Sequence, residues 1–456
     1  MILETTRVPA TTSMTRLVLM GLAGTSIEWY DFFLYGLGSA LVFPTLFFAK
    51  TLPPFVALMA SFSTFAVGFF ARPVGAVVFG HFGDRMGRKT ALAIALVLMG
   101  VATTLVGCLP SYATAGVAAP VLLVALRFLQ GLAIGGQWGG AMLLIVENAP
   151  ARRRGFYGSF AQAGAPVGVV LANLAFLLVS AVAPPDAFVA WAWRVPFLLS
   201  IALVVLGLYV HFRVEDTAAF RELRRASGGE YAGQGTARAP VLEAFREHSR
   251  IIFLAAGSFI ATQVVFYVLV TFSIAYGTSP IGLNLSRTTM LTAVLIGSGT
   301  MAPTLLLCGA LSDRFGRRRI YRIGCVLTGL WAFMVFPLLE TGSLLWISVS
   351  VAVALGLTGM MYGPQAALFG ELFRTRIRYS GASLGYQIGS MLGGALAPLI
   401  ATSIVATFHA TRGVALYIAV ACAISFTCVS LLRETSDVSL HEEASGPGRI
   451  VSVTGG

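Results

Sequence analysis

Two acidic residues stand three positions apart in an aromatic stretch near the start of the chain, GTSIEWYDFFLYG at residues 24–36. On a helix, Glu28, Asp31 and Tyr35 share one face, because they are spaced by three and four residues. A charge at bilayer depth costs about 2.5–3.5 kcal/mol, so such residues tend to face a bundle interior or a wet cavity. Burial favours a protonated carboxyl group, and a nearby cation favours the ionised form. A carboxylate that alternates between these surroundings can load and release a proton, which makes Glu28 and Asp31 the candidates for proton coupling.

Two arginines stand inside other apolar stretches, Arg72 in FFARPVG and Arg127 in VALRFLQG. Because a guanidinium group binds a carboxylate through two parallel hydrogen bonds, both are candidates for holding an anionic substrate. Each could instead be the structural partner of Glu28 or Asp31, and Pro73 indicates a bend beside Arg72. Both interpretations remain open from the sequence.

Neutral polar and aromatic groups accompany these charges in several apolar stretches. Side chains of this kind can line a binding site, although helix packing explains each of them equally well. The second half of the chain contributes only neutral groups at this depth. The substrate contacts predicted in this way, besides the two arginines, are Tyr35, Gln130, Gln137, Trp138, Gln263, Tyr267, Tyr362, Gln365, Tyr386 and Gln387.

The overall composition indicates which kind of protein must position these residues. The chain has 456 residues, of which 57% are hydrophobic and 11% charged, and its mean hydropathy is +0.83. A soluble protein carries about a quarter charged residues, and a bilayer core needs about 20 apolar residues per helix. Continuous apolar runs favour helices over a β-barrel. We predict an all-α polytopic membrane protein with spans near residues 17–46, 55–80, 90–109, 118–147, 156–181, 191–212, 251–275, 289–312, 321–339, 344–371, 381–405 and 412–432.

Positive charge is divided unevenly between the two sets of loops. The net charge is +12, and most of the 31 lysines and arginines lie at the termini or in the loops after even-numbered spans. Because positively charged loops stay in the cytoplasm, we expect a multi-pass protein of the cell (inner) membrane with both termini inside. This distribution also argues against a nucleic-acid partner, and the polar N-terminus shows no removable signal peptide.

Residues typical of cofactor or enzyme sites are scattered in this sequence. The five cysteines fall mostly in apolar runs without a CxxC pair, so we expect small buried residues rather than metal or redox chemistry. The five histidines form no His-x-x-His or Ser-His-Asp arrangement at span depth. We therefore expect no enzyme activity, no cofactor and no metal, and we expect a monomer.

Two motifs recur in the same order in the two halves of the chain. GHFGDRMGRKT at 80–90 matches GALSDRFGRRRI at 309–320, and VENAPARRRGFYG at 146–158 matches GELFRTRIRYSG at 370–381. Internal repeats of this kind are typical of transporter folds, in which the substrate site lies between the repeats. We predict a first six-helix half over 1–212, a cytoplasmic linker over 213–250, a second six-helix half over 251–433 and a cytoplasmic tail over 434–456.

The repeated motifs combine acids and arginines at the expected cytoplasmic end of the helices. Their glycines permit a tight turn, and an acid there can accept hydrogen bonds from a helix N-terminus or pair with an arginine. The Gly-Lys-Ser/Thr ending of a phosphate-binding loop is absent. We predict a latch that is closed when the protein faces outward and broken when it faces inward, formed by Asp84, Arg85, Arg88, Glu147, Arg154, Asp313, Arg317, Glu371 and Arg378.

These motifs also carry a family resemblance. GHFGDRMGRK contains the pattern Gly-x-x-x-Asp-Arg-x-Gly-Arg-Lys, RFLQG contains Arg-x-x-Gln-Gly, and with both the chain resembles the major facilitator superfamily. EWYDFFLYG and RFLQGLAIGGQWGG are similar more specifically to the metabolite:H+ symporter family. That resemblance implies twelve helices in two pseudo-symmetric halves, with the first helix against a central cavity. Relatives often carry Glu where Gln137 stands here, which argues against a proton role at that position.

The leading functional hypothesis is secondary active transport, in which a small organic acid metabolite enters with protons. The resemblance also implies alternatives, because similar proteins import zwitterionic osmolytes such as betaine or proline. A third hypothesis is proton-antiport efflux, since GSFAQAGAPVG at 158–168 faintly resembles an element of drug/H+ antiporters. Sodium remains an alternative coupling ion. The expected partners are therefore a small molecule, protons and the lipid bilayer.

Overall fold

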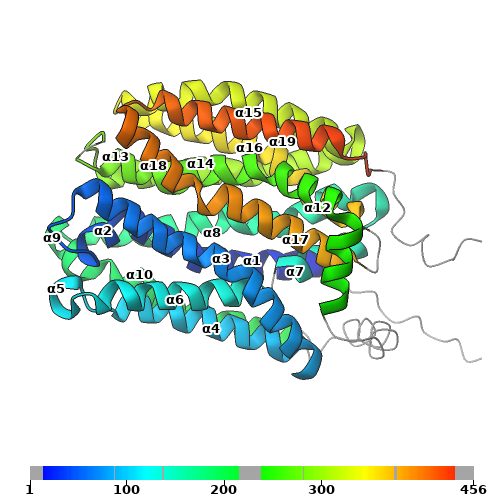
Figure 1. Cartoon of the computed structure of the whole chain (residues 1–456), viewed down its shortest axis with the longest axis horizontal. Coiled ribbons are helices and arrows are strands. Elements are labelled where there is room, and N and C mark those ends of the chain that lie inside the picture. Colours follow the sequence, from blue (N-terminus) through cyan, green and yellow to red (C-terminus); the bar gives the residue numbers. More distant parts are fainter. Residues whose placement is uncertain are drawn as a thin grey trace, which may run out of the picture.

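The computed structural model describes residues 14–86, 88–135, 138–214, 238–280, 282–373 and 377–436 (Figure 1). Nearly all of these residues are helical, and the described ranges contain no strand. The elements of the first half are α1 Met14–Leu41, α2 Phe43–Leu46, α3 Pro54–Met86, α4 Arg88–Cys108, α5 Tyr112–Ala115, α6 Ala118–Gly135, α7 Trp138–Asn148, η1 Ala151–Arg153, α8 Arg154–Val182, α9 Pro185–Ala187, η2 Phe188–Ala192 and α10 Arg194–Val214. Those of the second half are α12 Arg238–Tyr267, η3 Val268–Phe272, α13 Ser273–Thr278, α14 Arg287–Phe315, α15 Arg317–Glu340, α16 Leu344–Leu372, α17 Arg378–Ser390, η4 Met391–Ala395, α18 Ala397–Phe408 and α19 Arg412–Leu431.

The helices confirm the expected set of membrane spans. Ten helical segments in the described part of the chain are long and apolar enough to cross a bilayer. Two shorter apolar helices, Ala93–Cys108 and Phe188–Ala202, lie at the places of the third and sixth expected spans. The all-α polytopic fold with twelve spans is therefore confirmed. Most of the predicted linker, at 215–237, lies outside the described residues, so the predicted domain boundaries stay predictions.

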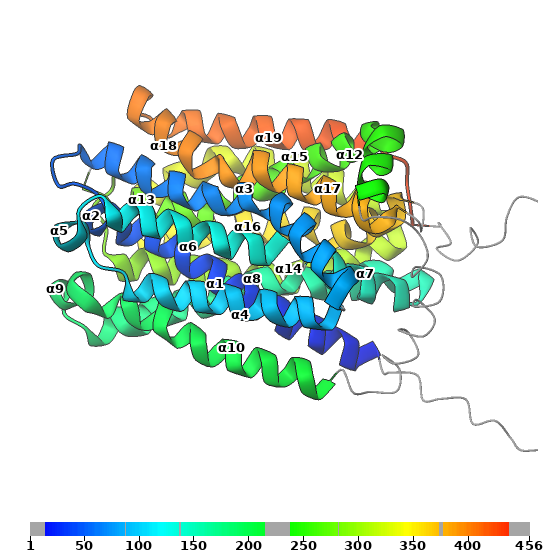
Figure 2. The same cartoon turned by 60° about the horizontal axis from the view of Figure 1, so that its bottom comes forward.

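The long helices run along one axis (Figures 1 and 2), and the described arginine-rich segments 152–154 and 317–322 lie with Arg378 at one end of the bundle. We call this the basic end; it holds the ends of α14 and α16 and the starts of α8 and α17. The other end, with α9 and α13, is called the opposite end. Near the basic end α12 bends at His248, where the backbone leaves helical geometry with φ −127° and ψ 22°.

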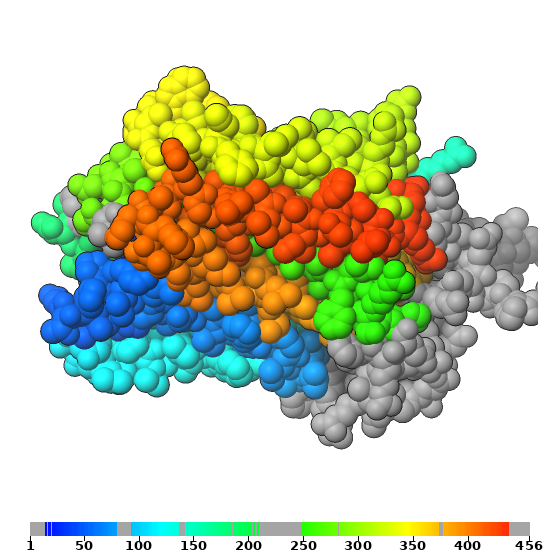
Figure 3. All heavy atoms as spheres, turned by 45° about the horizontal axis from the view of Figure 1, so that its top comes forward, coloured from blue at the N-terminus to red at the C-terminus, as the bar shows by residue number. Residues whose placement is uncertain are grey.

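Two long contacts join the halves. Helix α8 of the first half packs along α14 of the second half, and α3 packs against α17, η4 and α18. The space-filling view shows α3 in blue lying directly against α18 in orange (Figure 3). The central helices of both halves therefore meet along the middle of the bundle, where the predicted site must lie.

Helices α3 and α6 approach each other so closely that their contact requires glycine. A Cβ atom added to Gly131 would lie 2.7 Å from the Cβ of Ala71, which is shorter than real Cβ contacts. An added Cβ at Gly135 would overlap the carbonyl group of Arg72. Because these glycines let the backbones touch, Arg72 of α3 and Arg127 of α6 are held close to each other inside the first half.

Candidate functional site

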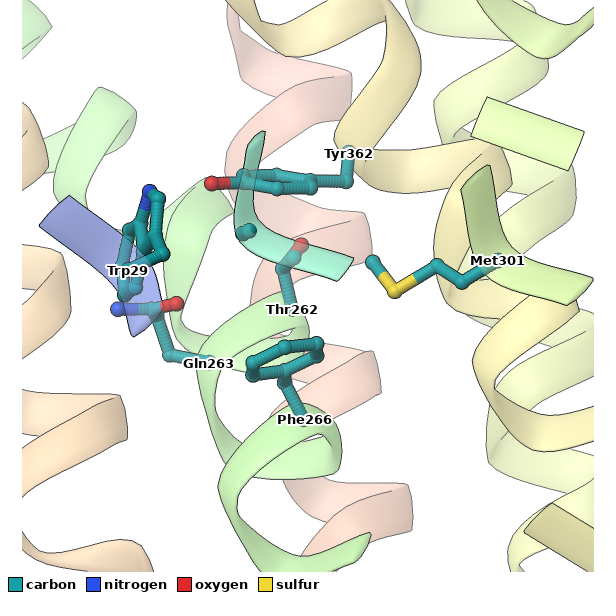
Figure 4. A pocket seen from close by; sticks show the side chains of 7 residues that line it. Trp29, Thr262, Gln263, Phe266, Met301 and Tyr362 are labelled. Atoms are coloured by element: carbon teal, nitrogen blue, oxygen red, sulfur yellow. The ribbon is translucent and has the colours of Figure 1, made fainter. Parts of the chain in front are cut away.

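A small cavity lies at the junction of the two halves (Figure 4). Figure 4 shows the rings of Tyr362 and Phe266 on either side of Thr262, with Gln263 beside Trp29. The cavity therefore combines aromatic faces with an amide and hydroxyl groups, which suits a small polar molecule with an apolar part. Its lining residues come from α1, α8, α12, α14 and α16, and they are Trp29, Ala165, Thr262, Gln263, Phe266, Met301 and Tyr362.

Two buried guanidinium groups share one aromatic ring beside this cavity. The Cζ atoms of Arg72 and Arg127 lie 4.6 Å and 4.2 Å from the centroid of the Phe32 ring. Their exposed fractions are 1% and 0%. The Cζ atom of Arg72 also lies 5.9 Å from the ring centroid of Trp29, which lines the cavity. Aromatic faces attract cations, but two like charges in an apolar interior are costly without an anion.

No carboxylate of the described residues neutralises this pair directly. Neither arginine forms an ion pair within 4.0 Å with Glu28 or Asp31. Among the described contacts, Nε and Nη2 of Arg72 and Nη2 of Arg127 have no hydrogen-bond acceptor. A buried donor without an acceptor is costly, so these nitrogens are suited to receive a carboxylate.

The predicted contacts Gln130 and Tyr35 lie inside the first half. The amide oxygen of Gln130 accepts from Nη1 of Arg127 at 3.2 Å, and its nitrogen donates to Thr103 at 2.7 Å. The Tyr35 hydroxyl donates to Thr64 at 2.8 Å, and its ring lies 4.3 Å from the Arg127 guanidinium. Both side chains thus orient Arg127, and neither lines the cavity described above.

The two acids of α1 are both buried, but they have different neighbours. Glu28 is 6% exposed and acts electrostatically on Arg72, Tyr362 and Tyr386. Asp31 is 1% exposed and points toward α4 and α10. The hydroxyl groups of Thr103 and Ser200 approach its carboxyl group, but neither completes a hydrogen bond.

The other predicted contacts occupy the second half near the cavity. Gln263 and Tyr362 line the cavity itself, and Gln263 also donates to Ser390 at 3.0 Å. The ring centroid of Tyr267 lies 6.1 Å from that of Phe32, and the ring centroid of Tyr386 lies 4.6 Å from that of Phe259.

The remaining predicted contacts are glutamines and one tryptophan. Gln365 is fully buried, and both of its side-chain amide atoms lack a hydrogen-bond partner among the described residues. The Gln387 side chain is 5% exposed. Gln137 and the Trp138 side chain lie outside the described residues.

At the basic end, the repeated motifs pair across the two halves. Arg378 of the second half donates to Glu147 of the first half at 2.9 Å. Arg154 of the first half lies 4.0 Å from Glu371 of the second half. Because Glu147 and Arg154 correspond to Glu371 and Arg378 in the repeat, the two pairs are reciprocal.

Asp313 adds a third connection between the halves at this end. Its two carboxylate oxygens accept from the backbone N–H groups of Gly155 and Phe156, both at 2.8 Å. These N–H groups belong to the first turn of α8, where a negative charge is favoured. The guanidinium group of Arg317 bridges two carboxylates. Its Nη1 atom lies 2.5 Å from Asp313, and its Nη2 atom lies 3.3 Å from Glu371. The side chains of Asp84, Arg85 and Arg88, predicted in the same latch, lie outside the described residues.

Several residues of the site went unnoticed in the sequence. Trp29 and Phe266 stand next to predicted residues, and their aromatic character was the available signal. Met301 and Thr103 gave no signal, because an apolar or hydroxyl residue in a span usually packs. Glu434, whose carboxylate accepts from the backbone N–H group of Arg317 at 2.8 Å, lies beyond the last span in the predicted tail.

Known proteins resemble this chain in sequence over nearly its whole length. The family model described as Major Facilitator Superfamily matches residues 32–385 and residues 283–454. The "Inner membrane metabolite transport protein YhjE" of Escherichia coli (strain K12) is 40% identical over 434 residues, covering 94% of this chain and 96% of that protein. The "Shikimate transporter" of the same organism is 39% identical, covering 92% and 94%. The "Proline/betaine transporter" of Salmonella typhimurium is 31% identical, covering 91% and 82%.

Solved structures share the fold at lower identity. The crystal structure of a D-xylose-proton symporter superposes with a TM-score of 0.71 at 19% identity, covering 93% of this chain and 99% of that one. A partially occluded inward-open structure of the xylose transporter XylE from E. coli gives 0.69 at 17% identity, covering 94% and 100%.

The fold and these relatives define a multi-pass membrane transporter rather than an enzyme. The chain belongs to the Major Facilitator Superfamily and, within it, to the metabolite transporters. Its substrate is a small molecule.

Proposed function

We propose that this protein imports a small organic acid together with protons by alternating access of the inter-half cavity. The observation that carries this proposal is the pair of buried arginines on the Phe32 ring, which have unoccupied donors and no ion-pair partner among the described residues. A guanidinium fork recognises a carboxylate through two hydrogen bonds. A carboxylate substrate would thus supply the anion that this site lacks.

The charges of the two acids set the order in which the proton and the organic acid bind. Two cations and two ionised acids give the buried site almost no net charge. Protonation of one acid leaves a net positive charge, which favours binding of an anion. The proton therefore binds first and the organic acid second, and release in reverse order follows when the cavity opens to the other side.

Orientation and location in the cell follow from charge. The basic end carries the arginine-rich loops, and such loops stay in the cytoplasm. We therefore place both termini and the ion pairs of the basic end on the cytoplasmic side of the inner membrane. The similarity to an inner membrane metabolite transport protein of Escherichia coli supports this location.

One observation favours a second substrate class. The cavity holds the rings of Trp29, Phe266 and Tyr362, and aromatic faces also bind quaternary ammonium groups. The relative named for proline and betaine transport makes a zwitterion the alternative substrate. Efflux by proton antiport would use the same cavity in the reverse direction.

An uptake screen in proteoliposomes tests these alternatives. Purified protein is reconstituted and offered labelled hydroxylated carboxylic acids, betaine and proline, with an inward proton gradient, with a sodium gradient, or with neither. We expect accumulation of a carboxylic acid only with the proton gradient. Accumulation of betaine or proline but of no acid would replace the proposed substrate class, and sodium-driven accumulation would replace the coupling ion.

We expect Asp313→Asn to favour opening at the basic end. The variant removes the charge that Asp313 offers to the first turn of α8, an interaction that contributes up to about 2 kcal/mol. A reporter cysteine at the cavity residue Ala165, which is 2% exposed, should then react about five- to thirtyfold faster with an impermeant maleimide added from that side. The matched control is Asp186→Asn, an exposed acid at the opposite end. An unchanged rate in Asp313→Asn contradicts the latch.

A further inference from the structure

The opposite end of the bundle contains a cation–aromatic contact between the halves. The Cζ atom of Arg287, the first residue of α14 in the second half, lies 3.7 Å from the centroid of the Phe188 ring. Phe188 is fully buried and begins the π-helical turn η2 between α9 and α10 of the first half. It also packs against Phe176 of α8, with ring centroids 6.1 Å apart. The ring is therefore fixed in the first half, and the cation reaches it from the second half.

Nothing within α14 itself favours a positive charge at Arg287, its first residue. A cation in the first turn of a helix opposes the helix dipole. The N-terminus is already capped, because the Ser286 hydroxyl accepts from the Thr289 N–H group at 3.0 Å. No described acid lies within 4.0 Å of Arg287 to form an ion pair. The Phe188 ring is thus the partner that accounts for this charge.

The other described contacts between the halves at this end join uncharged groups, and they include the packing of α3 against α18. The Ser403 hydroxyl lies 3.7 Å from the sulfur of Met59, and Gly36 of α1 packs near the Thr271 hydroxyl. The contact of Arg287 with Phe188 adds the attraction of a cation to an aromatic face, which grows stronger as the pair is desolvated.

We propose that Arg287 and Phe188 form the latch of the opposite end, which must break before the cavity opens toward that side. The proposal rests on alternating access in the proposed function, but it depends on no particular substrate or coupling ion. The two ends then close by different chemistry. Carboxylates and arginines hold the basic end, whereas an arginine and a phenyl ring hold the opposite end.

The test measures access to the cavity without a substrate. A variant carries a single cysteine at Ala165, with the five native cysteines replaced, and an impermeant maleimide is added to sealed vesicles of known orientation. We expect Arg287→Gln and Phe188→Leu each to raise the labelling rate from the opposite-end side about two- to tenfold. The double variant should gain no more than the larger single effect, because each change removes the same interaction.

Two conservative variants and one control complete the design. Phe188→Tyr keeps an aromatic face and should label as the parent does, while Arg287→Lys should give an intermediate rate, so the pair stays testable if a larger change prevents insertion. The control is Arg194→Gln, because the Arg194 guanidinium lies 4.5 Å from the neighbouring Trp193 ring within one half. Unchanged labelling in both single variants, additive effects in the double variant, or an equal rise in the control overturns the proposal. Failure to find an imported organic acid leaves these rates unaffected, so the two failures are distinguishable.

Discussion

Asp31→Asn should abolish accumulation driven by a proton gradient while substrate exchange continues. Asp31 is 1% exposed, and both of its carboxylate oxygens lack a hydrogen-bond donor among the described residues. An ionised carboxylate in such a place is costly, so we expect Asp31 to carry a proton while it is buried in this way. Asparagine cannot release that proton, whereas exchange of substrate for substrate does not require its release.

The size of the effect follows from the gradient itself. For one proton per substrate, a gradient of one pH unit supports about tenfold accumulation, and the variant should fall to about equal concentrations on both sides. The measurement compares accumulation with counterflow in the same proteoliposomes. Asp186→Asn, an exposed acid, is the control and should accumulate as the wild type does. Full accumulation in Asp31→Asn would contradict an essential role, and Glu28→Gln would then be the next variant to examine.

Arg127→Lys should weaken carboxylate binding by about ten- to a hundredfold, because a hydrogen bond to a charged group contributes about 1.5–3 kcal/mol. Lysine keeps the charge but loses the planar fork. In this protein the fork is held by the Phe65 carbonyl at 3.4 Å, by Gln130 at 3.2 Å and by the Phe32 ring. The unpaired Nη2 atom is the donor that we expect to meet the substrate.

Binding to purified wild type and variant, measured from mildly acid to mildly alkaline pH, provides the test. Arg194→Lys is the matched control, because Arg194 also lies over an aromatic ring but far from the cavity, at the opposite end. Equal affinity of wild type and Arg127→Lys would remove Arg127 from the site. Tighter wild-type binding of a betaine than of any carboxylate would favour the osmolyte alternative.

The cross-half pairs show how far an internal repeat can predict a structure. The repeat shows that Glu147 corresponds to Glu371 and Arg154 to Arg378. It does not show that each glutamate meets the arginine of the other half, as Glu147 and Arg378 do at 2.9 Å. That pairing depends on how the ends of the helices pack, which local sequence does not determine. The contact of Arg287 with Phe188 is hidden for the same reason.

The two acids of α1 mark the same limit at shorter range. Helical spacing places Glu28 and Asp31 on one side of α1, yet three residues still leave a rotation of about 60° between them. In the packed bundle that rotation is enough for Glu28 to influence Arg72 while Asp31 points toward α4 and α10. The structure likewise places both buried arginines on the Phe32 ring instead of in ion pairs with these acids.

The sequence by itself determined the twelve spans, the internal repeat and the charged residues that a membrane protein has reason to bury. These follow from composition and periodicity, because the cost of placing polar groups in a bilayer acts on each segment separately. Only the tertiary structure decided which buried charge meets which partner and where the cavity lies. Those features depend on contacts between helices that are far apart in the chain, and their energies arise only when the two halves pack together.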